Sequence, residues 1–212
     1  MRTVAVLPVK RFARAKQRLR GALPDGARQQ LAAAMAADVL EVLCGFEAFA
    51  RVVVVTGEPA VAEQAVSCGA HVVADRDEAG QSAAAAVGVL AAREIGAQRA
   101  LLVPGDTPCL QAGDLEALLG RGEPVVVVPD RHGTGTNALL LTPPGAIAPA
   151  FGPGSRRRHE TAAEAAGLEH AVVDVPALAL DVDTPDDLAA LRAEGRLGPR
   201  TAAALAAATA QS

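Results

Sequence analysis

Residues 52–68 read VVVVTGEPAVAEQAVSC. Four successive valines are typical of a short strand that is buried on both faces of a sheet. The Ala-rich residues after Pro59 suit a helix, and proline fits the first turn of a helix. A continuous apolar strand followed at once by a helix is the repeating unit of folds with parallel sheets. This stretch therefore predicts an α/β fold.

The same alternation of short Val-rich runs and Ala/Leu-rich segments extends along most of the chain. The expected strands are 4–9, 52–56, 72–74, 100–103, 125–128, 138–141, 171–175 and 178–182, and the expected helices are 27–44, 59–68, 80–95, 112–119 and 155–166, with one more opening at Thr184 and Pro185. We predict a Rossmann-like mixed, mainly parallel sheet with right-handed crossovers. We expect one domain over residues 1–198, and an Ala-rich C-terminal tail over 199–212 whose last dozen residues form a frayed helix.

The amino-acid composition argues against nucleic-acid and membrane partners. Half of the 212 residues are hydrophobic, the formal net charge is −4, and Trp and Tyr are absent. A nucleic-acid surface would need a broad basic face with stacking aromatic rings, so no nucleic-acid partner is expected. No apolar stretch reaches the length of a membrane span, and the N-terminus lacks the apolar region of a signal peptide. We therefore expect a soluble cytoplasmic protein without a membrane partner.

The three cysteines are Cys44, Cys68 and Cys109. Their odd number and their spacing argue against a disulfide framework and against structural zinc. Each lies in an apolar context, so we expect three small core residues.

Two neighbouring segments have the residue types that hold an anion: residues 130–137 read DRHGTGTN and residues 151–159 read FGPGSRRRH. Glycines allow close backbone approach, free amides at a helix start point toward negative charge, and arginine matches phosphate oxygens. The alternative is a plain Gly/Pro turn before a solvated basic helix start. Two such segments favour a phosphate, and the candidate substrate contacts are Thr136, Asn137, Gly152, Gly154, Ser155 and Arg156.

Carboxylates follow the expected strands as well. Asp106 lies between Pro104 and Pro108 after a buried strand, and Asp181 and Asp183 would share one face of a strand. If the sheet brings all three together, they form a hard, oxygen-rich Mg²⁺ site. The alternative assigns Asp183 to helix capping and Asp181 to a surface pair.

The basic loop after the first strand contains Lys10 and Lys16, which could act as point charges on a polyphosphate. The alternative is a solvated basic loop that enters a helix; a Walker A motif is absent. Gly80 and Ser82 begin an expected helix that could face a nucleotide base or sugar, or could be an ordinary helix start.

Several of these elements, in this order, resemble those of the 2-phospho-L-lactate / phosphoenolpyruvate guanylyltransferases of coenzyme F-420 biosynthesis. They are LPVK at 7–10, Ala15-Lys16, PGDTP at 104–108, GTNAL at 135–139, FGPGS at 151–155 and DVDTP at 181–185. The resemblance spans roughly residues 3–194. It implies a nucleotidyltransferase fold related to the molybdenum cofactor guanylyltransferases, of GT-A-like type.

The resemblance also implies roles for individual residues. Thr136, Gly152 and Ser155 would bind the phospho-acid, Asp106 and Asp183 with Asp181 would hold Mg²⁺, and Lys16 would contact the phosphates of GTP. Asp106 and Lys16 are thus the catalytic candidates. Ser82 stands where family members often carry Asn, which leaves base or ribose contacts by Gly80 and Ser82 open.

The expected activity is transfer of GMP from GTP to the phosphate of a small phospho-carboxylic acid, with release of pyrophosphate. Phosphoenolpyruvate is favoured over 2-phospho-L-lactate, and a homodimer that hands its product to the next enzyme of the pathway is a further expectation. The alternatives are a nucleotidyltransferase for molybdopterin or a sugar phosphate, and a non-catalytic nucleotide-binding module on the same fold.

Overall fold

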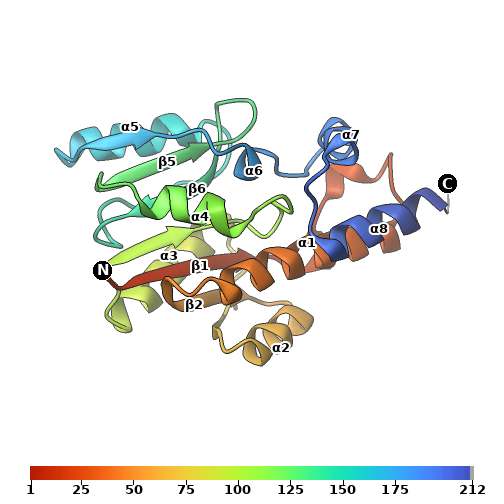
Figure 1. Cartoon of the computed structure of the whole chain (residues 1–212), viewed down its shortest axis with the longest axis horizontal. Coiled ribbons are helices and arrows are strands. Elements are labelled where there is room, and N and C mark those ends of the chain that lie inside the picture. Colours follow the sequence, from red (N-terminus) through yellow and green to blue (C-terminus); the bar gives the residue numbers. More distant parts are fainter. Residues whose placement is uncertain (211–212) are drawn as a thin grey trace.

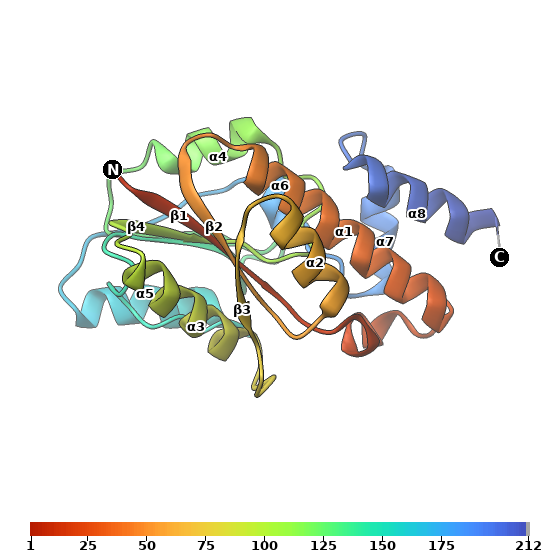
Figure 2. The same cartoon turned by 90° about the horizontal axis from the view of Figure 1, so that it is seen from below.

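The computed structural model describes residues 1–210, which form a seven-stranded sheet covered by helices on both faces (Figures 1 and 2). The strands are β1 Thr3–Val9, β2 Phe49–Thr56, β3 His71–Ala74, β4 Arg99–Leu102, β5 Val125–Pro129, β6 Thr136–Leu141 and β7 His170–Val172. Their order across the sheet is β3-β2-β1-β4-β6-β5-β7. Strand β6 is antiparallel to β4 and β5, and the other pairs are parallel. The predicted mainly parallel α/β sheet is confirmed.

The helices are α1 Asp25–Gly45, α2 Pro59–Ser67, α3 Gln81–Glu94, α4 Ala112–Leu119, α5 Ser155–Ala165, α6 Pro176–Ala179, α7 Pro185–Ala193 and α8 Pro199–Ala210, with short 3-10 turns η1 Phe12–Arg14 and η2 Gln17–Leu19. The predicted start of α7 is confirmed, because Thr184 Oγ1 accepts the Asp187 amide and the Asp187 carboxylate accepts the Thr184 amide. Among residues 1–210, no helix combines the length and the apolar character needed to cross a membrane.

Alternating side chains of β1 pack into two hydrophobic cores, one on each face of the sheet. Ala5, Leu7 and Val9 pack with α1, α2 and α4 on one face, whereas Val4 and Val6 pack with α3 and α5 on the other (Figure 2). A third apolar cluster joins η2, the N-terminal half of α1, α7 and α8 (Figure 1). This third cluster supports the segments that carry Lys16, Asp106 and Asp183.

The strand expected at 178–182 is absent. Pro176 begins the short helix α6, and residues 180–183 have no regular structure. Leu178, Leu180 and Val182 are buried, so their alternation reflects insertion into two cores and not strand pairing. The preceding expected strand, 171–175, is reduced to β7 at His170–Val172.

The C-terminal segment is more ordered than a frayed tail. Helix α8 lies along α1 (Figure 1), and Thr201, Leu205 and Ala208 are buried. The buried Asp38 carboxylate of α1 accepts the Thr201 amide at 2.8 Å, the Thr201 hydroxyl at 2.7 Å and the Arg200 amide at 3.2 Å. A carboxylate that satisfies helix-start amides fixes the start of α8 on α1. The last two residues of the expected tail lie outside the described part of the chain.

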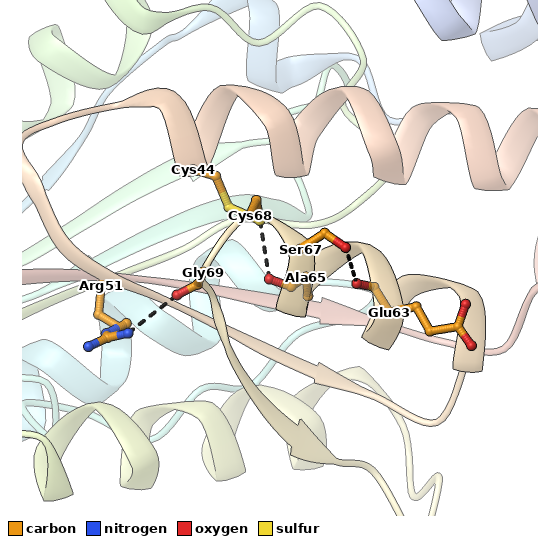
Figure 3. The surroundings of a disulfide bond; sticks show 7 residues. All are labelled: Cys44, Arg51, Glu63, Ala65, Ser67, Cys68 and Gly69. Carbon is orange, nitrogen blue, oxygen red and sulfur yellow. Dashed lines mark hydrogen bonds between the residues drawn. A yellow bond between two sulfur atoms is a disulfide. The ribbon is translucent and has the colours of Figure 1, made fainter.

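The expectation of three unpaired cysteines is wrong for two of them. A disulfide joins Cys44, near the end of α1, to Cys68, at the end of α2 (Figure 3). Both helices cover the same face of the sheet, and their packing brings the two Cα atoms to 6.2 Å, within the range that a disulfide spans. Cys109 is buried and free, as expected.

Candidate active site

A cavity of about 300 Å³ opens at the carboxyl edge of the sheet, between β1, β4 and the loop of residues 10–24. Ligands of open α/β sheets bind at this edge. Its charged and polar lining residues are Lys10, Lys16, Gln17, Arg18, Asp75, Gln81, Asp106 and Asp183. The rest of the lining is mostly small or apolar, including Ala32 and Ala36 of α1 and Gly105 after β4.

The Lys16 ammonium joins two of the predicted carboxylates. Its Nζ lies 2.5 Å from Asp106 Oδ2 and 2.9 Å from Asp183 Oδ1. The Lys16 side chain is only 6% exposed, whereas those of Asp106 and Asp183 are 27% and 48% exposed. The structure therefore brings together both predicted catalytic residues, which are far apart in sequence, in the lining of the cavity.

The charges of this cluster shift two pKa values. Burial alone would lower the pKa of the Lys16 amine, but attraction to Asp106 and Asp183 outweighs it and raises that pKa above its ordinary value. Burial, followed by repulsion from Asp106, raises the pKa of Asp181 to about 6. A carboxyl group that resists ionisation next to two other carboxylates indicates a position where a further positive charge is favoured.

The three aspartates were predicted to hold Mg²⁺. Within residues 1–210, no group of three His, Cys, Asp or Glu side chains has the arrangement of a metal site. Asp106 and Asp183 instead converge on the Lys16 ammonium. Mg²⁺ is commonly bound through one or two carboxylates, so Asp106 and Asp183 are chemically suited to hold it. The magnesium site stays a prediction.

Asn137 is not part of the cavity lining and supports the segment that carries Asp181. Its side-chain amide donates to the carbonyl oxygens of Leu178 at 2.8 Å and Ala179 at 3.1 Å, and to Asp181 Oδ1 at 3.1 Å. These bonds fix the irregular chain after α6. The predicted substrate contact is therefore buried and bonded within the protein.

Thr136 is also bonded internally. Its hydroxyl lies 3.0 Å from His159 Nδ1, and His159 Nε2 accepts the Ala150 amide at 2.8 Å. Because Nε2 accepts, the ring proton of a neutral His159 lies on Nδ1 and is donated to Thr136. Burial, and then the nearby Arg158 charge, lower the pKa of His159 to about 4. This neutral pair ties β6 to α5 and to the chain before Phe151.

The start of α5 has the backbone shape expected of an anion site. Gly152 and Gly154 have positive φ values of 108° and 69° and are exposed, and Gly154 is the N-cap. Ser155 is the first helical residue; its Oγ is buried and has no hydrogen-bond partner among the described residues. Arg156 is turned toward Glu160 and the Gly133 carbonyl. An unpaired buried hydroxyl is unusual, and a bound ligand or water at the helix start would satisfy it.

The start of α3 links the two regions. Gly80 precedes the helix with φ 109°, and Ser82 Oγ donates to the Phe151 carbonyl at 3.3 Å. Gln81, between them, lines the cavity, as does Asp75 after β3. Neither was among the sequence candidates, although Asp75 directly follows the end of β3 and could have been found by the same reasoning that selected Asp106.

Comparisons with known proteins identify the family of the chain. The sequence model of the family described as "Guanylyl transferase CofC like" matches residues 3–198. A phosphoenolpyruvate guanylyltransferase of Conexibacter woesei is 50% identical over 196 residues, which cover 91% of this chain and 88% of the relative. One from Rubrobacter xylanophilus is 42% identical over 199 residues, covering 92% of this chain and 96% of the relative.

Solved structures show the same fold at low identity. A protein of Desulfovibrio desulfuricans G20 ascribed to the nucleotide-diphospho-sugar transferases superposes with a TM-score of 0.78 at 17% identity, covering 99% of this chain and 96% of the other. A nucleotidyl transferase from Methanothermobacter thermautotroptrophicus gives a TM-score of 0.64 at 19% identity, with coverage of 90% and 96%. On the sequence match over residues 3–198 and the 50% identity, this chain belongs to the CofC-like guanylyltransferase family.

Proposed function

We propose that this protein transfers GMP from GTP to the phosphate of phosphoenolpyruvate and releases pyrophosphate. The observation that carries the proposal is the Lys16 ammonium held between Asp106 and Asp183 in the lining of the cavity. Relatives up to 50% identical are named for this acceptor, which favours it over 2-phospho-L-lactate. Coenzyme F-420 biosynthesis is the pathway that such a product would serve.

The residues present suit a reaction between two anions. A phosphomonoester is largely dianionic near neutral pH, since its second pKa is about 6, so its oxygen attacks the α-phosphorus without a general base. The His159 ring is buried, bonded on both sides and held neutral, so it is not placed to act as a base. Catalysis then consists of positioning and charge neutralisation.

Positive groups around the cavity supply that neutralisation. Lys10, Lys16 and Arg18 line it, and Lys16 would contact the GTP phosphates while the bond to pyrophosphate breaks. Mg²⁺, when bound by Asp106 and Asp183 with Asp181, would add divalent charge against the triphosphate. The exposed glycines at positions 152 and 154, with the unpaired Ser155 hydroxyl, would receive the acceptor phosphate.

A pyrophosphate-release assay tests the proposal. GTP with Mg²⁺ is combined separately with phosphoenolpyruvate, 2-phospho-L-lactate and 3-phosphoglycerate, with ATP and CTP as donor controls and mass spectrometry of the products. We expect fastest release with GTP and phosphoenolpyruvate, and none above background with Asp106→Ala at saturating Mg²⁺. If another acid is turned over faster, that acid replaces phosphoenolpyruvate as the assigned acceptor. Tight GTP binding without release for any acid would point to a binding module and overturn the proposal.

A further inference from the structure

Lys16 has an unusual backbone. It lies between η1 and η2 with φ 53° and ψ 36°, in the left-handed region that glycine adopts freely and a residue with a Cβ rarely adopts. Such a conformation persists only where surrounding contacts determine it. The position of the Lys16 ammonium depends on this backbone, because a different φ or ψ would send the side chain away from the two carboxylates.

One buried side chain holds the backbone on both sides of Lys16. Arg28, in the first turn of α1, is 1% exposed. Its Nη1 donates to the Ala15 carbonyl at 2.9 Å and to the Lys16 carbonyl at 3.3 Å. These two carbonyls belong to the peptide groups before and after the Lys16 Cα. Since the planes of the two flanking peptides define φ and ψ, one guanidinium fixes both angles.

The other terminal nitrogen of Arg28 is paired with a carboxylate, whereas its buried Nε has no hydrogen-bond partner among the described residues. Its Nη2 donates to Asp25 Oδ1 at 2.6 Å, so the buried charge is paired within its own helix. Arg28 does not line the cavity and reaches neither Asp106 nor Asp183. The side-chain bonds of Arg28 outside its own helix therefore run to the Lys16 loop and not to the cavity.

We infer that Arg28 is a positioning residue that clamps the two peptide groups flanking Lys16 and thereby holds the Lys16 ammonium against Asp106 and Asp183. The kinetic consequence rests on the proposed function, but the structural consequence does not. A planar guanidinium suits the task because it presents fixed donors to two acceptors, whereas the ammonium of a lysine is a point charge on a flexible stem.

Amine labelling tests the clamp without any assay of activity. The chain has only two lysines, Lys10 and Lys16. Lys10 is exposed and serves as the internal reference, whereas the Lys16 side chain is buried and ion-paired. Acetylation by an N-hydroxysuccinimide ester, followed by peptide mass mapping, gives the rate at Lys16 relative to Lys10. The variants are Arg28→Met, which removes the donors, and Arg20→Met, which removes an exposed arginine of the same loop as a matched control.

We expect Arg28→Met to raise the relative rate at Lys16 about tenfold, the change that corresponds to loss of one charge-assisted hydrogen bond. Arg20→Met should leave the rate within about twofold of the parent protein. Unchanged protection of Lys16 in folded Arg28→Met would overturn the inference. If Arg28→Met does not fold, Arg28→Lys takes its place, because the added lysine lies at a separate position in the mass map.

Kinetics supply the second measurement. In the pyrophosphate assay, Arg28→Lys should lower kcat about 10²-fold, as a misplacement of about 1 Å does, while both KM values stay within about threefold. A merely structural role would lower the melting temperature and leave kcat intact at permissive temperature, which would contradict the inference. If the parent protein shows no guanylyl transfer, the proposed function fails, and the labelling rates alone decide whether the clamp exists.

Discussion

Replacing Lys16 by Met should separate the effect of the ammonium on stability from its effect on catalysis. Breaking a fully buried ion pair by removing one partner costs about 3–5 kcal/mol. Here Asp183 is 48% and Asp106 27% exposed, so water can solvate the carboxylates that remain, and we expect a loss of about 2 kcal/mol. In a chain of this size, that loss lowers the melting temperature by about 4–8 °C.

The loss of activity should be larger and of different origin. If Lys16 neutralises charge as pyrophosphate leaves, Lys16→Met lowers kcat about 10²–10³-fold, as removal of a preorganised donor does elsewhere. The double variant Lys16→Met/Asp183→Asn should regain part of the lost stability, because one uncompensated carboxylate is gone, but none of the lost kcat. Thermal melts and the pyrophosphate assay on the parent, both single variants and the double variant measure the two effects. Lys16→Met turnover within threefold of the parent protein would refute the catalytic role.

Three other predictions concern single features. Ser155→Ala should raise KM for the phospho-acid about tenfold and leave KM for GTP and the melting temperature unchanged, because the lost hydroxyl has no partner within the protein; a lower melting temperature with unchanged KM would contradict the phosphate-binding role. His159 has its pKa lowered from 6.5 to about 4 in the folded protein, so the unfolded chain takes up the proton first and stability is lost as pH falls through this window. In urea unfolding, the advantage of the parent over His159→Gln should therefore shrink by about 3 kcal/mol between pH 7 and pH 4, and a constant difference would exclude this cause. Reducing the Cys44–Cys68 disulfide, whose partners are 24 residues apart, should lower the free energy of unfolding by about 3 kcal/mol and leave kcat unchanged, with Cys68→Ser behaving like reduced protein; identical melts with and without reductant would show that the bond does not form.

The fold class was accessible from local patterns because its signals are local. The valine run at 52–55, Pro59 at a helix start and the Thr184 cap each predicted an element that is present. The error at 178–182 arose because Leu178, Leu180 and Val182 alternate as in a strand while each inserts into a core from a helical turn or an irregular segment. The alternation of apolar residues reflects which side chains are buried, and it does not distinguish a strand from an irregular segment.

The sequence likewise predicted some features of the candidate site and not others. Asp106, Asp183 and Lys16 could be named from residue type and from their places beside expected strands, because the carboxyl edge of a parallel sheet is where ligands bind. The ion pairs between them could not be predicted from the sequence, since Lys16 and Asp183 are separated by 167 positions. The internal bonds of Thr136 and Asn137 were equally out of reach: Thr136 contacts His159, and Asn137 binds the Leu178 and Ala179 carbonyls and Asp181. Their roles as substrate contacts stay predictions.

Periodicity, helix caps and residue chemistry are properties of short segments, so the chain alone determined its sheet-and-helix alternation, its family and most of the charged groups of the cavity. The left-handed backbone of Lys16, its clamp by Arg28, the docking of α8 on Asp38 and the pairing of Cys44 with Cys68 were decided by packing. Each requires two surfaces, formed by different parts of the chain, to meet at a set distance. That distance follows from how the helices pack on the sheet and on one another, and no short segment specifies it.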